Sequence, residues 1–455
     1  MHEIVVAQRK LFNSNVTKPV AFRLEQLEKL KAVLKANYPA LEDAIRKDYG
    51  KQAFETFLSE FFLIFDEIEV ATTNLTDWSS RKAVPTNILN MPGSSYIIPE
   101  PLGVSLVIGP WNYPYQLSLA PAVAAIAAGC TIVLKPSELT ANVSAMLARI
   151  IGDTFDADYF TVVEGGVPET SALLAEKFDM IFFTGSVPVG KIVYEAAARH
   201  LTPVVLELGG KSPTIIAADC DLDVAVKRII WGKFLNAGQT CIAPDYVCVH
   251  RSLYPRFLEK AAEAIAAADY SLQNGNYVQI VNERNAARVI GLIDSEKVIV
   301  GGGHSVDQRF IEPTVMKDVA WEDRVMNEEI FGPVLPVMAY DDLDELVGNI
   351  KARAKPLSLY LFTQDEAIKE KVLTEISFGG GCVNDAIMHI TNGDLPFGGV
   401  GDSGIGHYHG EPGFRAFSHY KSILDREVTI DPDLKFSPYS EEKLAQLKIV
   451  LNLDV

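Results

Sequence analysis

The fold is decided by a stretch that begins Val104-Ser-Leu-Val-Ile108, turns at Gly109-Pro-Trp-Asn-Tyr-Pro114 and continues through residues 117–134, which carry no charge. The first segment is a short apolar run of the kind that forms a buried strand. Residues 117–134 approach the length of a membrane span. They are rich in Ala, however, contain Pro121 and Gly129, and end in the largely β-branched run Thr-Ile-Val-Leu. A buried helix followed by a second buried strand explains them better, so the stretch predicts a strand–helix–strand unit.

Apolar strands and helices keep alternating along the chain, and the pattern restarts after Gly210. Parallel strands that are connected by helices form sheets covered on both faces. The predicted fold class is therefore α/β, with two doubly wound parallel-sheet domains plus a small bridging β element. The predicted strands are residues 131–135, 160–163, 180–183, 204–206, 214–217, 246–249 and 357–362, and the predicted helices are residues 23–34, 189–199, 222–235 and 253–267.

The length of 455 residues exceeds what one ordinary hydrophobic core holds, so we expect more than one domain. We also expect the Gly-rich segment 395–413 to be a loop. The predicted parts are a first domain at 1–208 with 84–102 as a bridging excursion, a second domain at 209–392, and a C-terminal return at 393–455 with 417–425 in the bridging sheet.

Composition excludes several classes of function. The net charge of −18 and the pI near 4.9 argue against binding to nucleic acid or to anionic membranes, which requires a basic face. The cysteines show no Cys-x-x-Cys spacing, so a disulfide framework or a zinc site is not expected and a reducing, cytoplasmic location is. His407 and His409 have the spacing of metal ligands, but no third ligand is evident and we expect no metal. The two ends of the sequence lack the patterns of a secretory signal and of a membrane anchor, so we expect neither.

Two segments suggest covalent catalysis. Val204-Val-Leu-Glu-Leu-Gly-Gly-Lys-Ser-Pro213 places Glu207 after a β-branched run, and Phe234-Leu-Asn-Ala-Gly-Gln-Thr-Cys-Ile-Ala-Pro244 places Cys241 after a small flexible turn. A thiol nucleophile and a carboxylate that deprotonates water are natural partners. Each residue alone has a simpler interpretation, because most Glu side chains are solvated charges and most free Cys side chains pack in a core.

Two strand ends suggest a dinucleotide site, because doubly wound sheets bind ligands at the carboxyl ends of their strands. Phe183-Thr-Gly-Ser-Val-Pro-Val-Gly190 opens a helix with a Gly-rich turn, which offers backbone N–H groups to a pyrophosphate. Lys135-Pro-Ser-Glu138 places a cation and a carboxylate in one turn, where the carboxylate can accept hydrogen bonds from a ribose diol. The alternatives are a plain turn and a surface ion pair, since the Gly-x-Gly-x-x-Gly pattern is absent.

Together these motifs resemble the aldehyde dehydrogenase superfamily. They occur in family order between about residues 99 and 423, with Glu328-Glu-Ile-Phe-Gly-Pro333 and Leu395-Pro-Phe-Gly-Gly-Val-Gly401 among them. The chain is most similar to the class 3 branch, which acts on fatty, aromatic and coniferyl-type aldehydes, because of the run after Cys241 and the tail Gly399-Val-Gly-x-Ser-Gly-x-Gly-x-Tyr-His-Gly410. The resemblance implies oxidation of aldehydes to carboxylates with NAD, or also NADP. A reductive member lacking the Glu base and a non-catalytic protein are the alternatives that Glu207 and Cys241 disfavour.

The resemblance also implies roles for individual residues. Cys241 would form a thiohemiacetal and then a thioester, and Glu207 would activate the hydrolytic water. The amide of Asn112 would stabilise the oxyanion with the backbone N–H of Cys241; as a turn residue before Tyr-Pro, Asn112 has an equally simple structural interpretation. The implied cofactor residues are Lys135 and Glu138 (adenosine ribose), Ser186 with Gly185 and Gly190 (pyrophosphate), Glu329 and Phe331 (nicotinamide ribose and ring), Trp111 and Leu208.

The implied substrate tunnel is apolar, which favours medium-chain aliphatic or aromatic aldehydes. In the same family the first domain binds NAD, the second is catalytic, and the bridging segments join subunits, so we expect a homodimer. The implied tunnel residues are Phe61, Phe62, Tyr113, Leu117, Trp231, Ile387 and Phe397.

Overall fold

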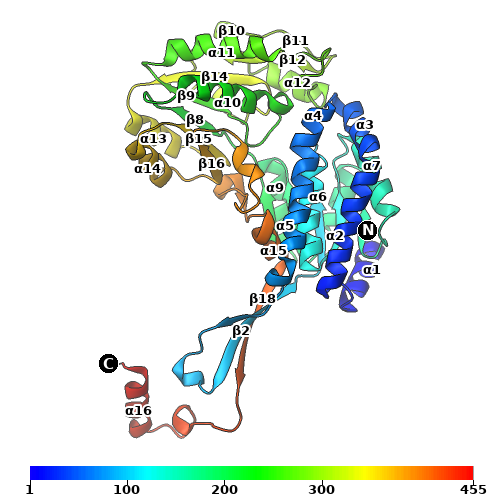
Figure 1. The fold of residues 1–455 in the computed structure, drawn as a ribbon, viewed down its shortest axis with the longest axis vertical. Helices are drawn as coiled ribbons and strands as arrows, with labels where there is room; N and C mark the ends of the chain where they lie inside the picture. The colour runs from blue at the N-terminus through cyan, green and yellow to red at the C-terminus, as the bar shows by residue number, and fades with distance from the viewer. Residues whose placement is uncertain (454–455) are drawn as a thin grey trace.

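The computed structural model describes residues 1–453, which form two lobes and a projecting arm (Figure 1). The first lobe is built on a six-stranded sheet of order β17-β7-β6-β3-β4-β5. Five of these strands are parallel, as predicted, while β17 joins β7 antiparallel at the edge. The strands are β3 (Val104–Ile108), β4 (Thr131–Lys135), β5 (Phe160–Val162), β6 (Met180–Thr184), β7 (Val204–Glu207) and β17 (Gly404–Ile405).

Helices cover both faces of this sheet, and one of them is buried along its whole length. Every residue of α6 (Gln116–Ala128) is buried, which explains why the segment carries no charge. Gly129 ends the helix in the left-handed conformation at a φ of 96°. The other helices of this lobe are α1 (His2–Asn13), α2 (Val20–Ala36), α3 (Tyr38–Tyr49), α4 (Ala53–Thr56), the π-helix η1 (Phe57–Phe61), α5 (Phe62–Trp78), α7 (Ala141–Gly152), α8 (Val167–Leu174) and α9 (Val187–Ala198).

The second lobe holds a seven-stranded sheet of order β10-β13-β14-β9-β8-β15-β16, parallel except for β10. Its strands are β8 (Pro213–Ile216), β9 (Tyr246–His250), β10 (Val298–Val300), β13 (Thr314–Met316), β14 (Val334–Tyr340), β15 (Ser358–Phe362) and β16 (Gly380–Val383), beside the small pair β11 (His304–Ser305) and β12 (Phe310–Ile311). Its helices are α10 (Leu222–Phe234), α11 (Tyr254–Ala268), α12 (Glu283–Ile290), α13 (Leu343–Lys351) and α14 (Glu366–Glu375).

The α/β class with two mainly parallel sheets is confirmed, but several elements were not predicted. Strand β14 contains Pro336, which lacks a backbone donor and weakens the strand signal. Helix α15 (Gly410–Ala416) begins inside the segment predicted to be a loop. Its first N–H groups need an acceptor, and Glu67 of α5 supplies one to the backbone N–H of Gly410 at 2.9 Å. A cap that comes from 343 residues away leaves no local trace in the sequence.

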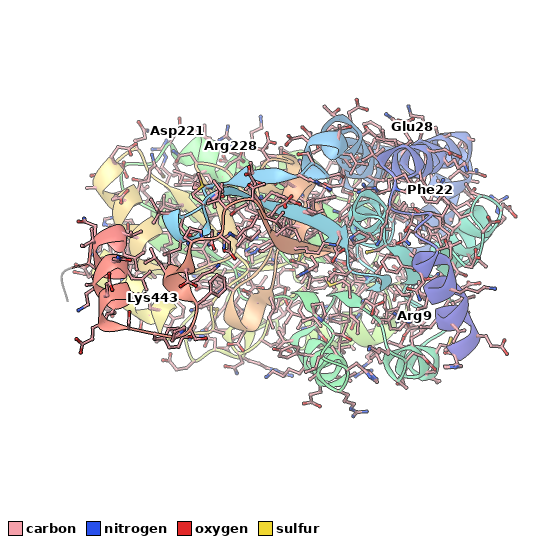
Figure 2. The ribbon with its side chains drawn as sticks, turned by 90° about the horizontal axis from the view of Figure 1, so that it is seen from below. Arg9, Phe22, Glu28, Asp221, Arg228 and Lys443 are labelled. Carbon is pink, nitrogen blue, oxygen red and sulfur yellow. The ribbon has the colours of Figure 1, made fainter. Side chains whose placement is uncertain are left out.

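The arm is a three-stranded antiparallel sheet that leaves the body of the molecule (Figure 1). Strand β2 (Gly93–Pro101) pairs along its length with β18 (Ser418–Arg426), and β1 (Lys82–Val84) lies on the other side. The chain then reaches α16 (Glu441–Leu451), whose Lys443 lies at the opposite end of the molecule from Arg9 and Phe22 of the first lobe (Figure 2). Within residues 1–453, no helix is long and apolar enough to cross a membrane.

Candidate active site

Glu207 and Cys241 line one cavity between the two lobes. Its volume is about 510 Å³, and Asn112 and Glu329 are also in its wall. Cys241 and Leu117 line a second cavity of about 250 Å³ as well. Cys241 therefore lines both cavities, so that a different molecule can reach it from each of them.

The loop that carries Cys241 has an unusual backbone. Asn236 and Ala237 have φ values of 53° and 51°, and Gly238 has a φ of 72°. A Cβ atom on Gly238 would lie 2.3 Å from the carbonyl oxygen of Gly332, so only glycine fits there. The side chain of Gln239 fastens the loop, because its Oε1 accepts from the N–H of Val281 at 2.9 Å. The nucleophile is thus presented by a braced turn rather than a free loop.

The environment of the thiol favours its neutral form. Burial raises the pKa of Cys241 far above its usual range, and the negative charges of Glu329 and Glu207 raise it further. Burial also raises the pKa of Glu207 well above 4.5. Neither carboxylate oxygen of Glu207 has a hydrogen-bond partner among residues 1–453. The carboxylate of Glu207 therefore makes no hydrogen bond that would stabilise the fold, and its oxygens are available to accept a proton.

Asn112 lies in the turn after β3 and is 3% exposed. Its Nδ2 donates to the carbonyl oxygen of Gln239 at 3.0 Å. An amide nitrogen has two hydrogens, and the second is available to an oxygen bound in the cavity that Asn112 and Cys241 share. The predicted oxyanion residue is therefore tied to the loop of the predicted nucleophile.

The larger cavity fits a dinucleotide. Gly185 and Ser186 line it at the N-terminus of α9, and the positive end of a helix dipole attracts phosphate. Oε1 of Glu329 is buried and has no hydrogen-bond partner in the described chain, so it can accept a hydrogen bond from a ribose hydroxyl. Burial and the charge of Asp245 raise the pKa of Glu329 to about 8. A Cβ atom on Gly209 would lie 1.9 Å from Oε2 of Glu329, so glycine is needed for this approach.

Three more predicted cofactor residues line the same cavity. The rings of Trp111 and Phe331 meet edge to face, with centroids 5.3 Å apart, and Leu208 forms another part of the wall. Gly190 lies behind Leu208: a Cβ atom there would lie 2.6 Å from its Cδ2. Gly190 therefore lets α9 pack closely on Leu208 and is not itself part of the wall.

Lys135 and Glu138 also lie outside the wall of this cavity. Lys135 ends β4 and is buried, and its Nζ donates to the carbonyl oxygen of Pro136 at 2.5 Å. Glu138 is exposed in the following turn. Burial lowers the pKa of Lys135, and the charges of Glu138, Glu169 and Glu164 oppose this shift.

The smaller cavity has an almost wholly apolar wall. Five predicted tunnel residues line it, but Phe61 and Phe62 do not. Phe61 is fully buried against Tyr38, with ring centroids 4.9 Å apart, and Phe62 is 38% exposed. The π-helix η1 adds a residue to the turn and rotates the side chains away from an α-helical pattern. The wall consists of Leu58, Ser59, Leu63, Tyr113, Gln116, Leu117, Trp231, Leu235, Thr240, Cys241, Ile242, Ile387, Met388, Ile390, Thr391 and Phe397.

Arg288 and Lys211 were not predicted as site residues. Arg288 lines the larger cavity and donates from Nη2 to the carbonyl oxygen of Ile330 at 2.7 Å. Lys211 pairs with Asp245 and donates to the carbonyl oxygen of Glu328 at 2.8 Å. Both side chains hold the segment that carries Glu329. Lys211 lies in the motif Glu207-Leu-Gly-Gly-Lys211, so the sequence could have indicated it, whereas Arg288 lies in none of the motifs found in the sequence. The described residues include no group of three or more His, Cys, Asp or Glu that could hold a metal ion.

Comparisons with known proteins agree with this geometry. Residues 1–423 match the model of the Aldehyde dehydrogenase family. The chain is 44% identical over 435 residues to the 4,4'-diaponeurosporen-aldehyde dehydrogenase of Staphylococcus aureus, covering 95% of each. It is 46% identical over 427 residues to the mouse aldehyde dehydrogenase named dimeric NADP-preferring, covering 93% of this chain and 94% of the other. The substrate-bound structure of Staphylococcus aureus AldH superposes with a TM-score of 0.96 at 42% identity, covering 99% of each chain.

Proposed function

This chain belongs to the aldehyde dehydrogenase family and is an NAD(P)-dependent aldehyde dehydrogenase, and we propose that it converts medium-chain aliphatic or aromatic aldehydes to carboxylates through Cys241. One observation carries the proposal. Cys241 lines both a cavity that contains the unpaired carboxylate of Glu207 and an apolar cavity that has no charged side chain in its wall.

In the first half of the reaction, Sγ of Cys241 attacks the aldehyde carbon and a C–S bond forms. The thiol proton moves to Glu207 or to water, and the carbonyl oxygen becomes an oxyanion. The free N–H of the Asn112 amide and the backbone N–H of Cys241 stabilise this charge where it develops. NAD(P), when bound, supplies the acceptor for the hydride that leaves the former aldehyde carbon, and a thioester on Cys241 remains.

In the second half, Glu207 removes a proton from water, and the hydroxide attacks the thioester carbon. The C–S bond breaks, the thiolate of Cys241 takes the proton held by Glu207, and the product leaves as a carboxylate after its acid proton passes to solvent. Burial raises the pKa of Glu207, which makes its carboxylate a stronger base toward water than an exposed Glu.

Replacement of Cys241 by Ala tests the proposal. The variant should lose aldehyde-dependent formation of the reduced cofactor and keep its affinity for the oxidised cofactor, because Cys241 contributes no charge to the larger cavity. Cys248→Ala is the matched control, since Cys248 is fully buried in β9 and lines neither cavity. Turnover by the Cys241 variant would refute the assignment of the nucleophile.

We further propose that residues 1–208 form the cofactor-binding domain and that residues 209–392 form the catalytic domain. We propose a cytoplasmic homodimer. Five free cysteines with no disulfide in the described chain support a reducing location. The mouse relative that is named dimeric, and the arm that projects from the body, support the assembly.

A further inference from the structure

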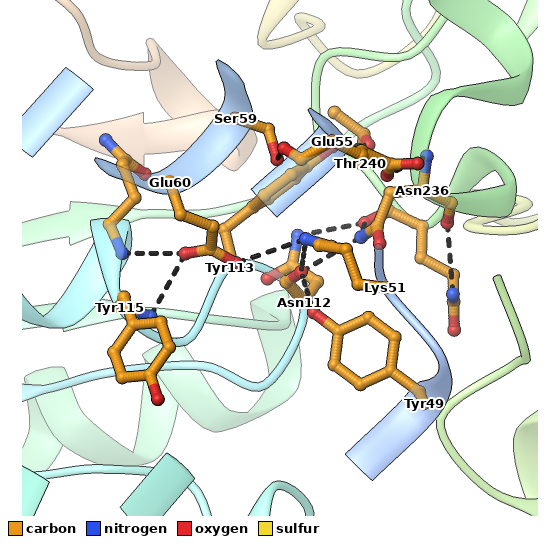
Figure 3. A network of polar contacts seen from close by, with 12 residues as sticks. Tyr49, Lys51, Glu55, Ser59, Glu60, Asn112, Tyr113, Tyr115, Asn236 and Thr240 are labelled. Carbon is orange, nitrogen blue, oxygen red and sulfur yellow. Dashed lines mark hydrogen bonds and ion pairs between the residues drawn. The ribbon is translucent and has the colours of Figure 1, made fainter. Parts of the chain in front are cut away.

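A buried polar network lies behind the turn that carries Asn112 (Figure 3). We propose that Asn236, backed by the Lys51–Glu60 ion pair, is a positioning residue that holds the amide of Asn112 against Cys241. This inference rests on the proposed oxyanion role of Asn112. We call Tyr49, Lys51, Glu60 and Asn236 the clamp.

Three residues of the clamp hydrogen-bond the backbone of Asn112 rather than its side chain. Three donors point at the carbonyl oxygen of Asn112: the hydroxyl of Tyr49 at 2.8 Å, Nδ2 of Asn236 at 2.9 Å and Nζ of Lys51 at 3.4 Å. A carbonyl oxygen has two lone pairs, so three donors saturate it. The peptide plane after Asn112 cannot rotate without breaking several buried hydrogen bonds, each of which is expensive to leave unmade.

Asn236 joins this turn to the loop of the nucleophile. Its Nδ2 also donates to the carbonyl oxygen of Gln239 at 3.2 Å, and Nδ2 of Asn112 donates to that same oxygen at 3.0 Å. The hydroxyls of Tyr113 and Thr240 form a second link at 2.5 Å. The two loops that must cooperate at the oxyanion are therefore held in register by shared acceptors, and the amide of Asn236 donates to a carbonyl oxygen in each loop.

The local backbone is built for Asn at this position. Asn236 has a φ of 53°, and Asn visits this left-handed region more readily than other residues with a Cβ atom. Its backbone N–H donates to Oε1 of Glu55 at 2.8 Å. The side-chain amide can then face two carbonyl oxygens at once.

The ion pair anchors the clamp to the protein core. Nζ of Lys51 lies 3.1 Å from Oε1 of Glu60, and both side chains are fully buried. The other oxygen of Glu60 accepts from the N–H groups of Tyr115 at 3.1 Å and Gln116 at 2.9 Å, at the start of α6. Lys51 also lies over the ring of Tyr113, 4.3 Å from its centroid. The charge of Lys51 is thus shared between the ion pair and the turn of Asn112.

A clamp of this kind acts on the transition state. The oxyanion exists only after the thiol has attacked, so loosening Asn112 should lower kcat and leave KM and cofactor affinity nearly unchanged. Loss of one oxyanion donor lowers kcat by about 100- to 1000-fold. A displaced donor keeps part of its effect, so we expect Asn236→Ala to lower kcat by about 10- to 100-fold.

A double-mutant cycle tests the coupling. Asn112→Ala should lower kcat, and Asn236→Ala should lower it no further in the Asn112→Ala background, because the two side chains act at one place. Asn37→Ala is the matched control: its Nδ2 also bonds a backbone carbonyl, that of Val33 at 2.9 Å, but it lies outside both cavities. Its kcat should equal that of the unmodified enzyme.

The outcomes separate the two proposals. If Asn112→Ala keeps full kcat, the oxyanion role itself is wrong. If Asn112→Ala lowers kcat but Asn236→Ala leaves kcat unchanged, only the positioning role is overturned. The same conclusion follows if the double variant shows a fall in kcat equal to the product of the two single effects.

A second variant covers the case in which Asn236→Ala does not fold. Lys51→Met alone would leave the carboxylate of Glu60 buried and unpaired, so it is combined with Glu60→Gln. The two substitutions together remove both charges, and the amide oxygen of Gln remains as an acceptor for the N–H groups of Tyr115 and Gln116. We expect this double variant to melt near the unmodified enzyme, to bind cofactor normally and to show kcat lowered several-fold. An unchanged kcat in the folded double variant would overturn the role of Lys51.

Discussion

Glu207 keeps two carboxylate oxygens without partners among the described residues, although it is only 3% exposed. Unsatisfied buried polar groups cost free energy of folding, so such an arrangement is retained at a site that uses it. The pairing with Cys241 in one cavity gives that use a chemical form, because the thioester must be hydrolysed after the aldehyde is oxidised.

The first prediction concerns the role of Glu207 in turnover. Glu207→Gln should still form the thioester once and then stall, because glutamine cannot take a proton from water. Rapid mixing should show a burst of reduced cofactor close to one per active site, followed by a slow steady rate. A variant without a burst would show that Glu207 acts before the oxidation, on the thiol of Cys241.

The second prediction concerns stability and pH. Burial raises the pKa of Glu207 in the folded state above its ordinary value of 4.5, so the folded state holds a proton that the unfolded state releases. The stability that this group contributes is present below pH 4.5 and is lost as pH rises through the raised pKa. Glu207→Gln cannot ionise. It should match the Tm of the unmodified enzyme near about pH 5 and exceed it near about pH 9. Parallel Tm curves for the two proteins would contradict this account.

The third prediction concerns cofactor choice. Lys135 is faced by the carboxylates of Glu138, Glu164 and Glu169, which repel a 2′-phosphate. We therefore expect a higher kcat/KM with NAD than with NADP, although a related mouse enzyme is named NADP-preferring. Glu138→Gln should narrow the difference between the two kcat/KM values, and Glu176→Gln, which removes a partly exposed carboxylate that pairs with His2, is the control. An unmodified enzyme that prefers NADP would show that Glu138 does not face the ribose.

At the scale of elements, the substrate cavity is made where η1, α6, α10 and the segment after β16 converge. None of these elements places a charged side chain on the side that lines the cavity: its wall includes Leu117, Trp231 and Ile387, but no Lys, Arg, Asp or Glu. An anionic group on a substrate would find no partner there. The volume of about 250 Å³ suits a chain of several carbons or one aromatic ring.

The fourth prediction follows from this wall. Burial of one CH₂ group is worth about 0.8 kcal/mol, so kcat/KM should rise by about fourfold for each added carbon until the cavity is full. Trp231→Ala should shift the optimum to longer aldehydes. Phe62→Ala is the control, because the ring of Phe62 lies outside the cavity, and its chain-length profile should be unchanged. A flat series, or a maximum at a charged semialdehyde, would count against the proposed substrate class.

At the scale of the whole molecule, the arm has little to pack against within its own chain (Figure 1). After β18 the segment exposes large apolar side chains, among them Val428 at 95%, Tyr439 at 82% and Ile449 at 79%. Large apolar side chains exposed along a projecting segment are typical of a segment that packs against a partner. A second copy of the chain would cover these side chains and could also pack against the arm sheet that contains β2 and β18.

The fifth prediction is that the enzyme is a homodimer at micromolar concentration, as measured by light scattering. Removal of the residues after Arg426 should weaken the dimer, because it deletes α16 and the exposed side chains before it. A full-length protein that scatters as a monomer, or a truncated protein that dimerises equally well, would disagree with this assembly.

The sequence by itself determined the α/β class and most of the strands of the first sheet. Buried strands such as β3 and β6 are continuous apolar runs, and this signal is local. The motifs around Glu207 and Cys241 could also be read directly, because a catalytic loop needs particular residues at fixed spacing. The family followed from the order of these motifs.

Only the tertiary structure decided which side chains meet. The π-turn of η1 turned Phe61 into the core and brought Leu58 into the cavity wall, and local periodicity cannot show such a shift. The cap on Gly410 comes from Glu67, and the donors on the carbonyl of Asn112 come from Lys51 and Asn236. These contacts join segments that are distant in the chain, and their energy depends on burial, which exists only once the fold has formed.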